Sequence, residues 1–186
     1  MHKLRPGAVI TTRDLVTTRS QRIRLPDPTG VVHLQFRRYA GCPFCNLHLR
    51  SVARRHQELV AAGIREVVVF QSSLVELLAQ HADVPFAVVA DPTRKLYAEF
   101  RVGGSPRAVL DPRAWLAGVR AVARKRPSLP ASSQQALGLP ADFLVAADGQ
   151  VLACKYGVHA YDQWSVDDLL HLASRHNRAI DHRLRT

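Results

Sequence analysis

Two cysteines three residues apart carry the clearest chemical signal in this sequence. Cys42 and Cys45 enclose Pro43 and Phe44 in the order Cys-Pro-Phe-Cys. The motif follows an apolar strand pattern over 31–36 and opens a helical pattern. Cys42 is therefore expected at a helix N-terminus, where unpaired N–H groups and the helix dipole favour the thiolate. Cys45, one turn further along, can attack a mixed disulfide formed at Cys42. The expected chemistry is thiol–disulfide exchange or peroxide reduction.

The same two cysteines suit a metal site less well. A structural zinc site usually has four ligands. His48 follows Cys45 at helical spacing, but the sequence contains no second CxxC. A haem-attachment motif needs histidine at the position that Asn46 occupies. We therefore expect neither a metal ion nor an organic cofactor.

Two arginines precede the motif. Arg37 and Arg38 are close enough in sequence for either cation to lower the pKa of Cys42. Side chains alternate along a strand, so only one of the two is expected to face the site, and the sequence does not decide which. The third cysteine, Cys154, lies in a strand pattern with Leu152 and Tyr156 on its face. It is expected to be a buried core thiol, with a second resolving role as the alternative.

The elements around the motif alternate between strand and helix. Strands are expected where apolar residues alternate or form short runs, and helices where they recur at helical spacing after a capping signal. Strand patterns cover 21–25, 31–36, 67–70, 86–89, 143–146 and 151–156, and helical patterns cover 46–62, 74–80, 92–100, 112–122 and 166–175. This order predicts an α/β, thioredoxin-like fold with a mixed central sheet flanked by helices, an N-terminal strand pair and an inserted helix.

The chain is expected to form one domain over 1–176, followed by a flexible C-terminal tail over 177–186. Asp148-Gly149, between the last two strand patterns, predicts a hairpin with a type I′ turn. No apolar run is long enough to span a membrane. Three cysteines do not resemble the disulfide framework of a secreted protein, so a cytoplasmic location is expected.

The chain is strongly basic, with a net charge of +11. The basic residues are scattered from Arg5 to Arg185, and no zinc-finger or helix-turn-helix signature accompanies them. We therefore expect a solvated basic surface that steers anionic partners, and not a nucleic-acid-binding protein.

Three stretches of the sequence resemble the peroxiredoxin-like branch of the alkyl hydroperoxide reductase and thiol-specific antioxidant family. They cover 33–45 around the motif, 91–102, and 139–149. The resemblance implies a thioredoxin-like fold with its active cysteine at a strand-to-helix turn. It also implies that Pro140 is the cis-proline that faces the cysteines. Arg107, after a Gly-Gly-Ser-Pro break, is the candidate for the arginine that binds peroxide in peroxiredoxins.

One departure from the family pattern concerns the residues before the nucleophile. Peroxiredoxins place a threonine or serine three residues before the peroxidatic cysteine and a proline four residues before that. Here Tyr39 and Gln35 occupy those positions. The usual hydroxyl that holds the peroxide is therefore replaced, and the Tyr39 hydroxyl is the available donor.

The expected function is that of a thiol-dependent antioxidant oxidoreductase. Cys42 would attack a peroxide or a disulfide, and Cys45 would resolve the product to a Cys42–Cys45 disulfide that an external thiol reductant recycles. Tyr39 and Pro43 are supporting residues. The alternatives are a protein-disulfide reductase without peroxidase activity and a redox-sensing binding protein. Many proteins of this fold dimerise, so a homodimer is also considered.

Overall fold

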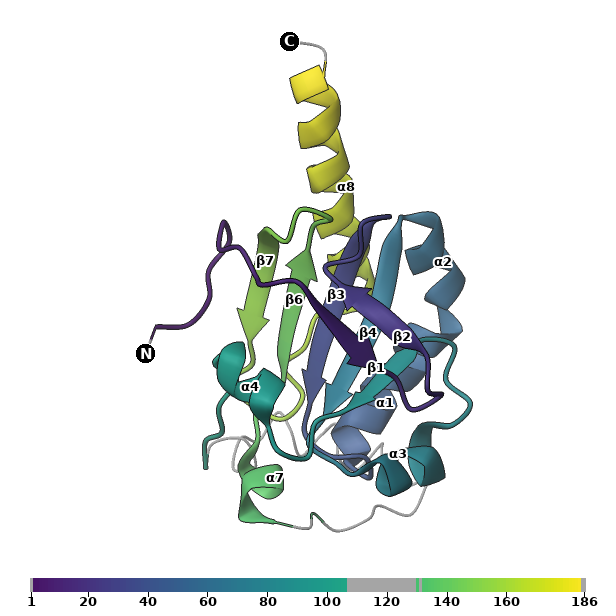
Figure 1. The fold of residues 1–186 in the computed structure, drawn as a ribbon, viewed down its shortest axis with the longest axis vertical. Helices are drawn as coiled ribbons and strands as arrows, with labels where there is room; N and C mark the ends of the chain where they lie inside the picture. Colours follow the sequence, from purple (N-terminus) through teal and green to yellow (C-terminus); the bar gives the residue numbers. More distant parts are fainter. Residues whose placement is uncertain (1, 107–129, 131, 185–186) are drawn as a thin grey trace.

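A five-stranded mixed sheet forms the centre of the protein in the computed structural model, which describes residues 2–106, 130 and 132–184 (Figure 1). Its strands are β3 (Val31–Arg37), β4 (Ile64–Phe70), β5 (Ala87–Ala90), β6 (Ala141–Val145) and β7 (Val151–Tyr156). They lie in the order β5-β4-β3-β6-β7. The first three are parallel, and β6 and β7 are antiparallel to their neighbours. The predicted thioredoxin-like sheet is thereby confirmed, with β3 at its centre.

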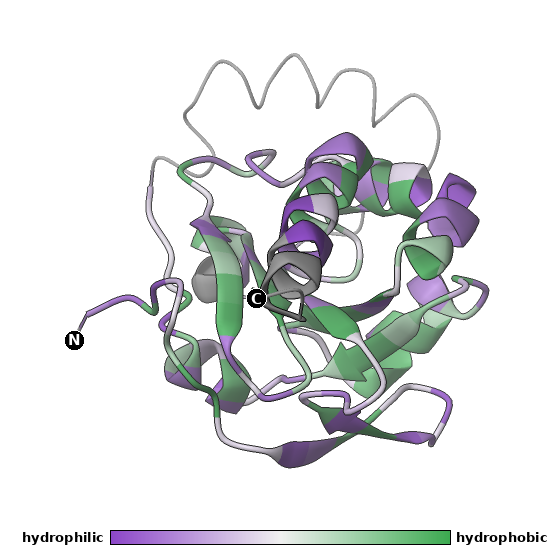
Figure 2. Cartoon of the chain, turned by 90° about the horizontal axis from the view of Figure 1, so that it is seen from above, coloured by the Kyte–Doolittle hydropathy of each residue, from purple (hydrophilic) through white to green (hydrophobic). Residues whose placement is uncertain are grey.

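Two layers cover the sheet. On one face lie α1 (Pro43–Arg54), α2 (His56–Ala61), α3 (Leu74–His81) and α8 (Val166–Leu184), which contribute buried residues to one apolar cluster. On the other face, α4 (Lys95–Glu99) packs with β1 (Arg13–Val16) and β2 (Arg22–Leu25). Figure 2 shows the hydrophobic residues concentrated between these layers. In the part of the chain that the structure describes, no helix is long and apolar enough to cross a membrane.

The strand pair that precedes the sheet differs from the expected one in its partner. The alternating pattern over 21–25 does form a strand, β2, but it pairs antiparallel with β1 and not with β3. The sequence pattern did not mark β1, because only one of its four residues, Leu15, is buried. The pair forms a small separate sheet that covers the apolar residues of β3.

Helix boundaries follow local capping chemistry. Ser73 and Glu76 form the predicted capping box at the start of α3. The predicted helix over 46–62 is divided into α1 and α2 at Arg55, and Gly63 ends it with a φ of +73°. The carboxylate of Asp91 accepts the first N–H groups of α4, although the helix begins at Lys95 because Arg94 adopts a left-handed conformation.

Three further details differ from the expectations. The last helix, α8, continues to Leu184, so most of the segment expected as a tail is helical and extends away from the body of the protein (Figure 1). The hairpin turn at Asp148-Gly149 is not type I′, because only Gly149 has a positive φ. A short helix, α7 (Ser133–Leu137), was not predicted. The helix expected over 112–122 lies outside the described residues.

Candidate active site

The CxxC motif lies at the carboxyl end of the central strand, as predicted. A turn follows β3, in which the Cys42 N–H donates to the Tyr39 carbonyl over 3.0 Å. Cys42 is the N-cap of α1, and Pro43 occupies the first turn of that helix. Proline suits this position because its missing N–H would have no partner inside the helix. The backbone thus fixes Cys42 at the helix N-terminus.

The two sulfurs are adjacent and fully buried. The Cys45 N–H donates to Sγ of Cys42 over 3.4 Å, and both side chains are 0 % exposed. No disulfide joins them, so this is the reduced state of the motif. A substrate can therefore reach either sulfur only after the surrounding residues move.

The two thiols titrate as a pair because one thiol is hydrogen-bonded to the other. Burial raises the pKa of Cys45, but the hydrogen bond from Cys42 and the charge of Arg38 outweigh it and lower the pKa to about 7. Burial, together with the hydrogen bond and the charge of Cys45, raises the pKa of Cys42 well above its usual value. The pair therefore holds one proton and one negative charge above neutral pH. The sequence analysis predicted a thiolate at Cys42 and did not consider a proton shared between the two thiols.

Arg38 is the arginine that contacts Cys42. Its Nη1 lies 3.8 Å from Sγ of Cys42, and its Nη2 donates to the carbonyl of Ala136 in α7. The guanidinium also lies 5.6 Å from the centre of the Tyr39 ring. The sequence did not decide which of the two arginines faces the site. In the structure Arg38 faces Cys42, and Arg37 points to the side of the sheet that α1 covers, where it contacts His48.

Tyr39 is buried beside the motif. Burial raises its pKa to about 12, and the charge of Cys42 adds to this effect, while Arg38 opposes it. The hydroxyl is therefore protonated at neutral pH and able to donate a hydrogen bond. This is the property that a replacement for the family's threonine or serine needs.

Main-chain contacts hold the turn before Cys42 in place. The Ala40 N–H donates to Oγ of Ser72 over 3.0 Å, and Nε2 of His81 lies 2.9 Å from the Ala40 carbonyl. The Tyr97 hydroxyl lies within hydrogen-bonding distance of the carbonyls of Arg37 and Val69. Residues from the segment after β4, from α3 and from α4 thereby fix the motif.

Gln71 is a buried polar residue at the same end of the sheet that the sequence analysis missed. It follows β4 directly, is almost fully buried, and its carbonyl accepts a hydrogen bond from Gln135 beside Ala136. Neither polar atom of its side chain has a partner among the described residues, and the same is true of Nε of Arg38. The available signal was its position: the carboxyl ends of neighbouring parallel strands meet at one edge of a sheet.

The remaining predicted residues have three different outcomes. Pro140 is buried directly before β6, but the Leu139–Pro140 bond is trans, so the expectation of a cis-proline was wrong. The Pro140 carbonyl accepts a hydrogen bond from the Gly157 N–H, and the Leu139 N–H donates to the Gly103 carbonyl. Both contacts are made with the trans isomer, which is the intrinsically favoured one. Arg107 lies outside the described residues.

Cys154 is half-buried and packs against the cluster on the opposite face of the sheet from Cys42, which favours its interpretation as a structural thiol.

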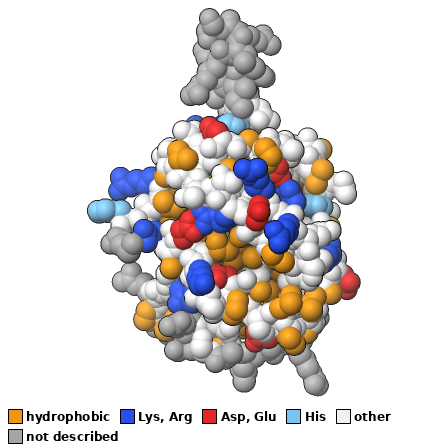
Figure 3. All heavy atoms as spheres, in the orientation of Figure 1, with side chains coloured by type: hydrophobic (Ala, Val, Ile, Leu, Met, Phe, Trp, Pro, Cys, Tyr) orange, Lys and Arg blue, Asp and Glu red, His pale blue; other side chains and the backbone are white. Residues whose placement is uncertain are grey.

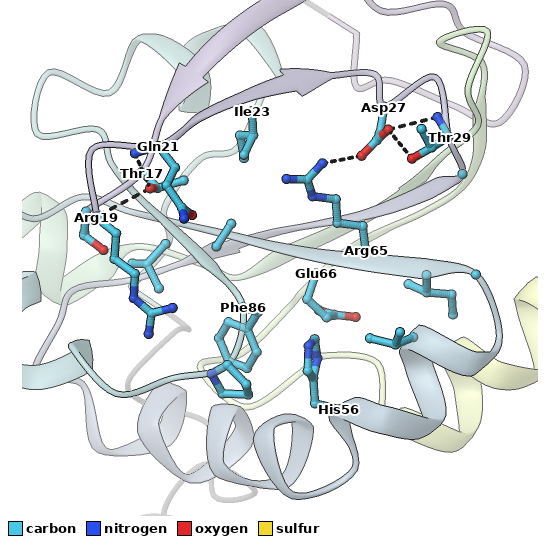
Figure 4. A pocket seen from close by; sticks show the side chains of 18 residues that line it. Thr17, Arg19, Gln21, Ile23, Asp27, Thr29, His56, Arg65, Glu66 and Phe86 are labelled. Carbon is cyan, nitrogen blue, oxygen red and sulfur yellow. Dashed lines mark hydrogen bonds and ion pairs between the residues drawn. The ribbon is translucent and has the colours of Figure 1, made fainter.

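A hollow of about 440 Å³ lies away from the motif (Figure 4). It is bordered by β2, the segment after β1, α2 and the amino end of β4, and neither cysteine of the motif lines it. Among the described residues, no group of histidine, cysteine, aspartate and glutamate side chains is arranged to hold a metal ion.

The comparisons with known proteins agree with this fold. The family model of the AhpC/TSA antioxidant enzymes matches residues 51–159, more than half of the chain, beginning after the motif. No curated protein matches the sequence. Among solved structures, peroxidoxin BcpB from Mycobacterium tuberculosis is 14 % identical, with 94 % of this chain and 98 % of that chain covered and a TM-score of 0.67.

Two further structures are similar. The reduced 2-Cys peroxiredoxin of Plasmodium vivax is 14 % identical, covers 98 % of this chain and 84 % of its own, and has a TM-score of 0.67. A protein described as the thiol:disulfide interchange protein DsbE from Chlorobium tepidum is 19 % identical, covers 92 % and 99 %, and has a TM-score of 0.61. These likenesses establish the thioredoxin-like fold, and the family match adds the type of enzyme: the chain belongs to the AhpC/TSA antioxidant enzyme family and is a thiol-dependent oxidoreductase.

Proposed function

We propose that Cys42 is the peroxidatic nucleophile and Cys45 the resolving thiol of a peroxide-reducing cycle. The observation that carries this assignment is the environment of Cys42 Sγ, which lies at the N-terminus of α1 with the Cys45 N–H and the Arg38 guanidinium directed at it. Backbone N–H groups at a helix N-terminus and a nearby cation both stabilise a thiolate.

The shared proton of the pair fits this division of roles. When Cys45 carries the negative charge, the Cys42 thiol is its hydrogen-bond donor. Transfer of that proton along the S–H···S bond moves the charge to Cys42, where Arg38 is already in place. Opening of the motif then exposes Cys42 as a thiolate while Cys45 holds the proton.

The cycle balances in three steps. The Cys42 thiolate attacks one oxygen of the hydroperoxide, the O–O bond breaks, and the leaving alkoxide or hydroxide takes up a proton, which leaves Cys42 as a sulfenic acid. Cys45 then attacks the Cys42 sulfur, water leaves, and a Cys42–Cys45 disulfide forms. Two thiols of an external reductant restore the dithiol and are themselves oxidised to a disulfide.

Three donors at the carboxyl ends of β3 and β4 suit the oxygens of a peroxide. Arg38 Nε and the side-chain amide of Gln71 have no hydrogen-bond partner among the described residues, and Tyr39 has a protonated hydroxyl. A buried donor without a partner costs free energy, and a bound substrate oxygen would satisfy it. These groups support peroxide binding although the usual threonine or serine is absent.

A protein-disulfide reductase is the second candidate. The departure at Tyr39 and Gln35 favours it, and so does the CxxC spacing, which allows the mixed disulfide at Cys42 to be resolved within one helical turn. In that cycle Cys42 attacks a disulfide in place of a peroxide, and the rest of the scheme is unchanged.

The proposed partners follow from either cycle. The substrate is a peroxide or a disulfide, and the reductant is a thioredoxin-like protein or a low-molecular-weight thiol. We place this chemistry in the cytoplasm, where such reductants keep thiols reduced, and a homodimer is compatible with it. On the face in Figure 3, lysine and arginine side chains are spread among acidic ones, which gives no support to a nucleic-acid surface there.

The test is stopped-flow reaction of the reduced protein with hydrogen peroxide and with an alkyl hydroperoxide. Cys42→Ser and Cys45→Ser are the controls. We expect fast sulfenic acid formation at Cys42 followed by a Cys42–Cys45 disulfide in the unmodified protein. A rate equal to that of a free thiol, with ready reduction of protein disulfides, would exclude the peroxidase and leave the reductase.

A further inference from the structure

The central strand carries three polar side chains that are completely buried. His33, Gln35 and Arg37 alternate along β3 and point to the face that α1 covers, and each is 0 % exposed. The residues between them, such as Leu34 and Phe36, point to the opposite face and belong to its apolar cluster. Burying charged groups is costly unless each has a partner of opposite charge.

Neighbouring strands supply those partners. Glu66 in β4 lies opposite His33, and Asp142 in β6 lies opposite Gln35. His33 Nδ1 is 2.9 Å from Glu66 Oε2, and His33 Nε2 is 3.1 Å from Asp142 Oδ1. Arg37 Nη2 is 2.6 Å from the same Asp142 oxygen. Burial opposes the protonation of His33, but the two carboxylates raise its pKa to about 9, so it is a cation at neutral pH.

The four charges alternate in sign, with Arg37 nearest the motif, followed by Asp142, His33 and Glu66. The neutral amide of Gln35 connects the two ends, because it donates to Glu66 and accepts from Arg37. Glu66 marks the far end and borders the hollow described above (Figure 4). The four groups together are neutral, so removing one cation and one carboxylate at either end leaves a neutral pair behind.

Arg37, the positive end of this row, contacts α1. Arg37 Nη2 lies 3.2 Å from Nε2 of His48, which follows Cys45 by three residues on the buried face of α1. Burial and the charge of Arg37 lower the pKa of His48 well below its usual value, so His48 accepts this hydrogen bond as a neutral ring. Arg37 also contributes, after Cys42 and Arg38, to the lowered pKa of Cys45.

We propose that Arg37 is a positioning residue for the redox reaction: Asp142 clamps its guanidinium beneath the first turns of α1, where its positive charge stabilises negative charge on the sulfur of Cys45. The positive charge of Arg38 stabilises negative charge on the sulfur of Cys42 in the same way. This inference rests on the proposed function, because Cys45 is the leaving group when the reductant's thiolate attacks Cys42. A bond then forms between the reductant sulfur and Cys42, the Cys42–Cys45 bond breaks, and its electron pair remains on Cys45.

The experiment compares two charge-neutral double variants of the full chain. Arg37→Gln with Asp142→Asn removes the pair at the motif end, and His33→Gln with Glu66→Gln removes a matched pair at the far end of the same row. The readouts are the thiolate absorbance near 240 nm against pH and the reduction potential of the disulfide. Neither readout needs a peroxide or a protein partner.

We expect the motif-end variant to move the lower thiolate transition upward by about one pH unit, which is tenfold less thiolate below the transition. At a pH above this transition in both proteins, its reduction potential should fall by about 30 mV, the equivalent of tenfold in the equilibrium constant. The far-end variant should leave both values unchanged. Arg37→Lys keeps the charge and should remain close to the unmodified protein.

Equal shifts in the two double variants, or no shift in either, would show that Arg37 has only a structural role and overturn the proposal. If the motif-end variant does not fold, Arg37→Met with Asp142→Leu removes the same charges with apolar side chains, a replacement that is often neutral or stabilising for a buried ion pair. An unmodified protein that shows the expected thiolate transition but does not reduce peroxide would refute the peroxidase alone.

Discussion

The guanidinium of Arg38 lies 3.8 Å from the sulfur of Cys42 and is held there by the carbonyl of Ala136. The two contacts join a residue at the end of the central strand to a helix nearly a hundred positions further along the chain. Fixing a cation in advance avoids the cost of ordering it when negative charge develops on the sulfur. The position of α7 therefore helps to hold Arg38 beside Cys42.

Arg38→Gln should slow the reaction of Cys42 with peroxide about tenfold at neutral pH, because the nearby positive charge is lost. The measurement is the second-order rate from stopped-flow fluorescence. Arg54→Gln, an exposed arginine in the last turn of α1, is the matched control and should retain the original rate. Equal rates in the two variants would contradict the role given to Arg38.

Cys45→Ser should lower the pKa of Cys42, since the negative charge and the hydrogen bond that raise it are removed. Alkylation of Cys42 with iodoacetamide, followed by mass spectrometry across pH, gives this value. The same variant should react with one equivalent of peroxide and stop at the sulfenic acid. A pKa equal to that of Cys42 in the unmodified protein would mean that the two thiols titrate independently.

Tyr39→Phe separates substrate binding from thiolate formation. If the hydroxyl donates to a peroxide oxygen, its loss should reduce the peroxide rate about five- to tenfold, the effect of one hydrogen bond. Alkylation by iodoacetamide should be unchanged, because the burial of Cys42 and its contact with Arg38 do not involve the hydroxyl. A parallel loss in both reactions would instead indicate that Tyr39 only orders the turn.

His33 predicts a dependence of stability on pH. Folding raises the pKa of His33 from 6.5 to about 9. Its stabilising contribution is therefore complete below pH 6.5, the pKa in the unfolded chain, and is lost as the pH rises through the pKa of the folded protein. The loss between these limits is on the order of 3 kcal/mol. Cys45, with its lowered pKa, has the opposite trend over part of this range, so both proteins compared should carry Cys45→Ser.

The measurement is urea unfolding at a series of pH values. The decline in the free energy of unfolding should be present in the Cys45→Ser protein and absent when His33→Gln and Glu66→Gln are added. A decline of the same size in both proteins would place the titrating group elsewhere.

The sequence was most informative where the pattern was local. A CxxC between a strand and a helix, and a serine three residues before a glutamate, each define a short piece of backbone, and both the start of α1 and the capping box of α3 were found as expected. The buried row on β3 was not predicted. Polar residues at 33, 35 and 37, alternating with apolar ones, also suit a strand with one solvent-facing side. They are buried because α1 and the segment at the start of α8 pack over that side.

The turn that presents Cys42 is held almost entirely through its main chain. The N–H and carbonyl of Ala40, the carbonyl of Tyr39 and the carbonyl of Arg37 make the anchoring contacts. A substitution in the turn can therefore alter what approaches the sulfur while the sulfur stays where it is. Because the main chain positions the sulfur and the side chains of the turn meet the substrate, we expect these side chains to differ between relatives. They are also practical positions at which to redesign substrate preference.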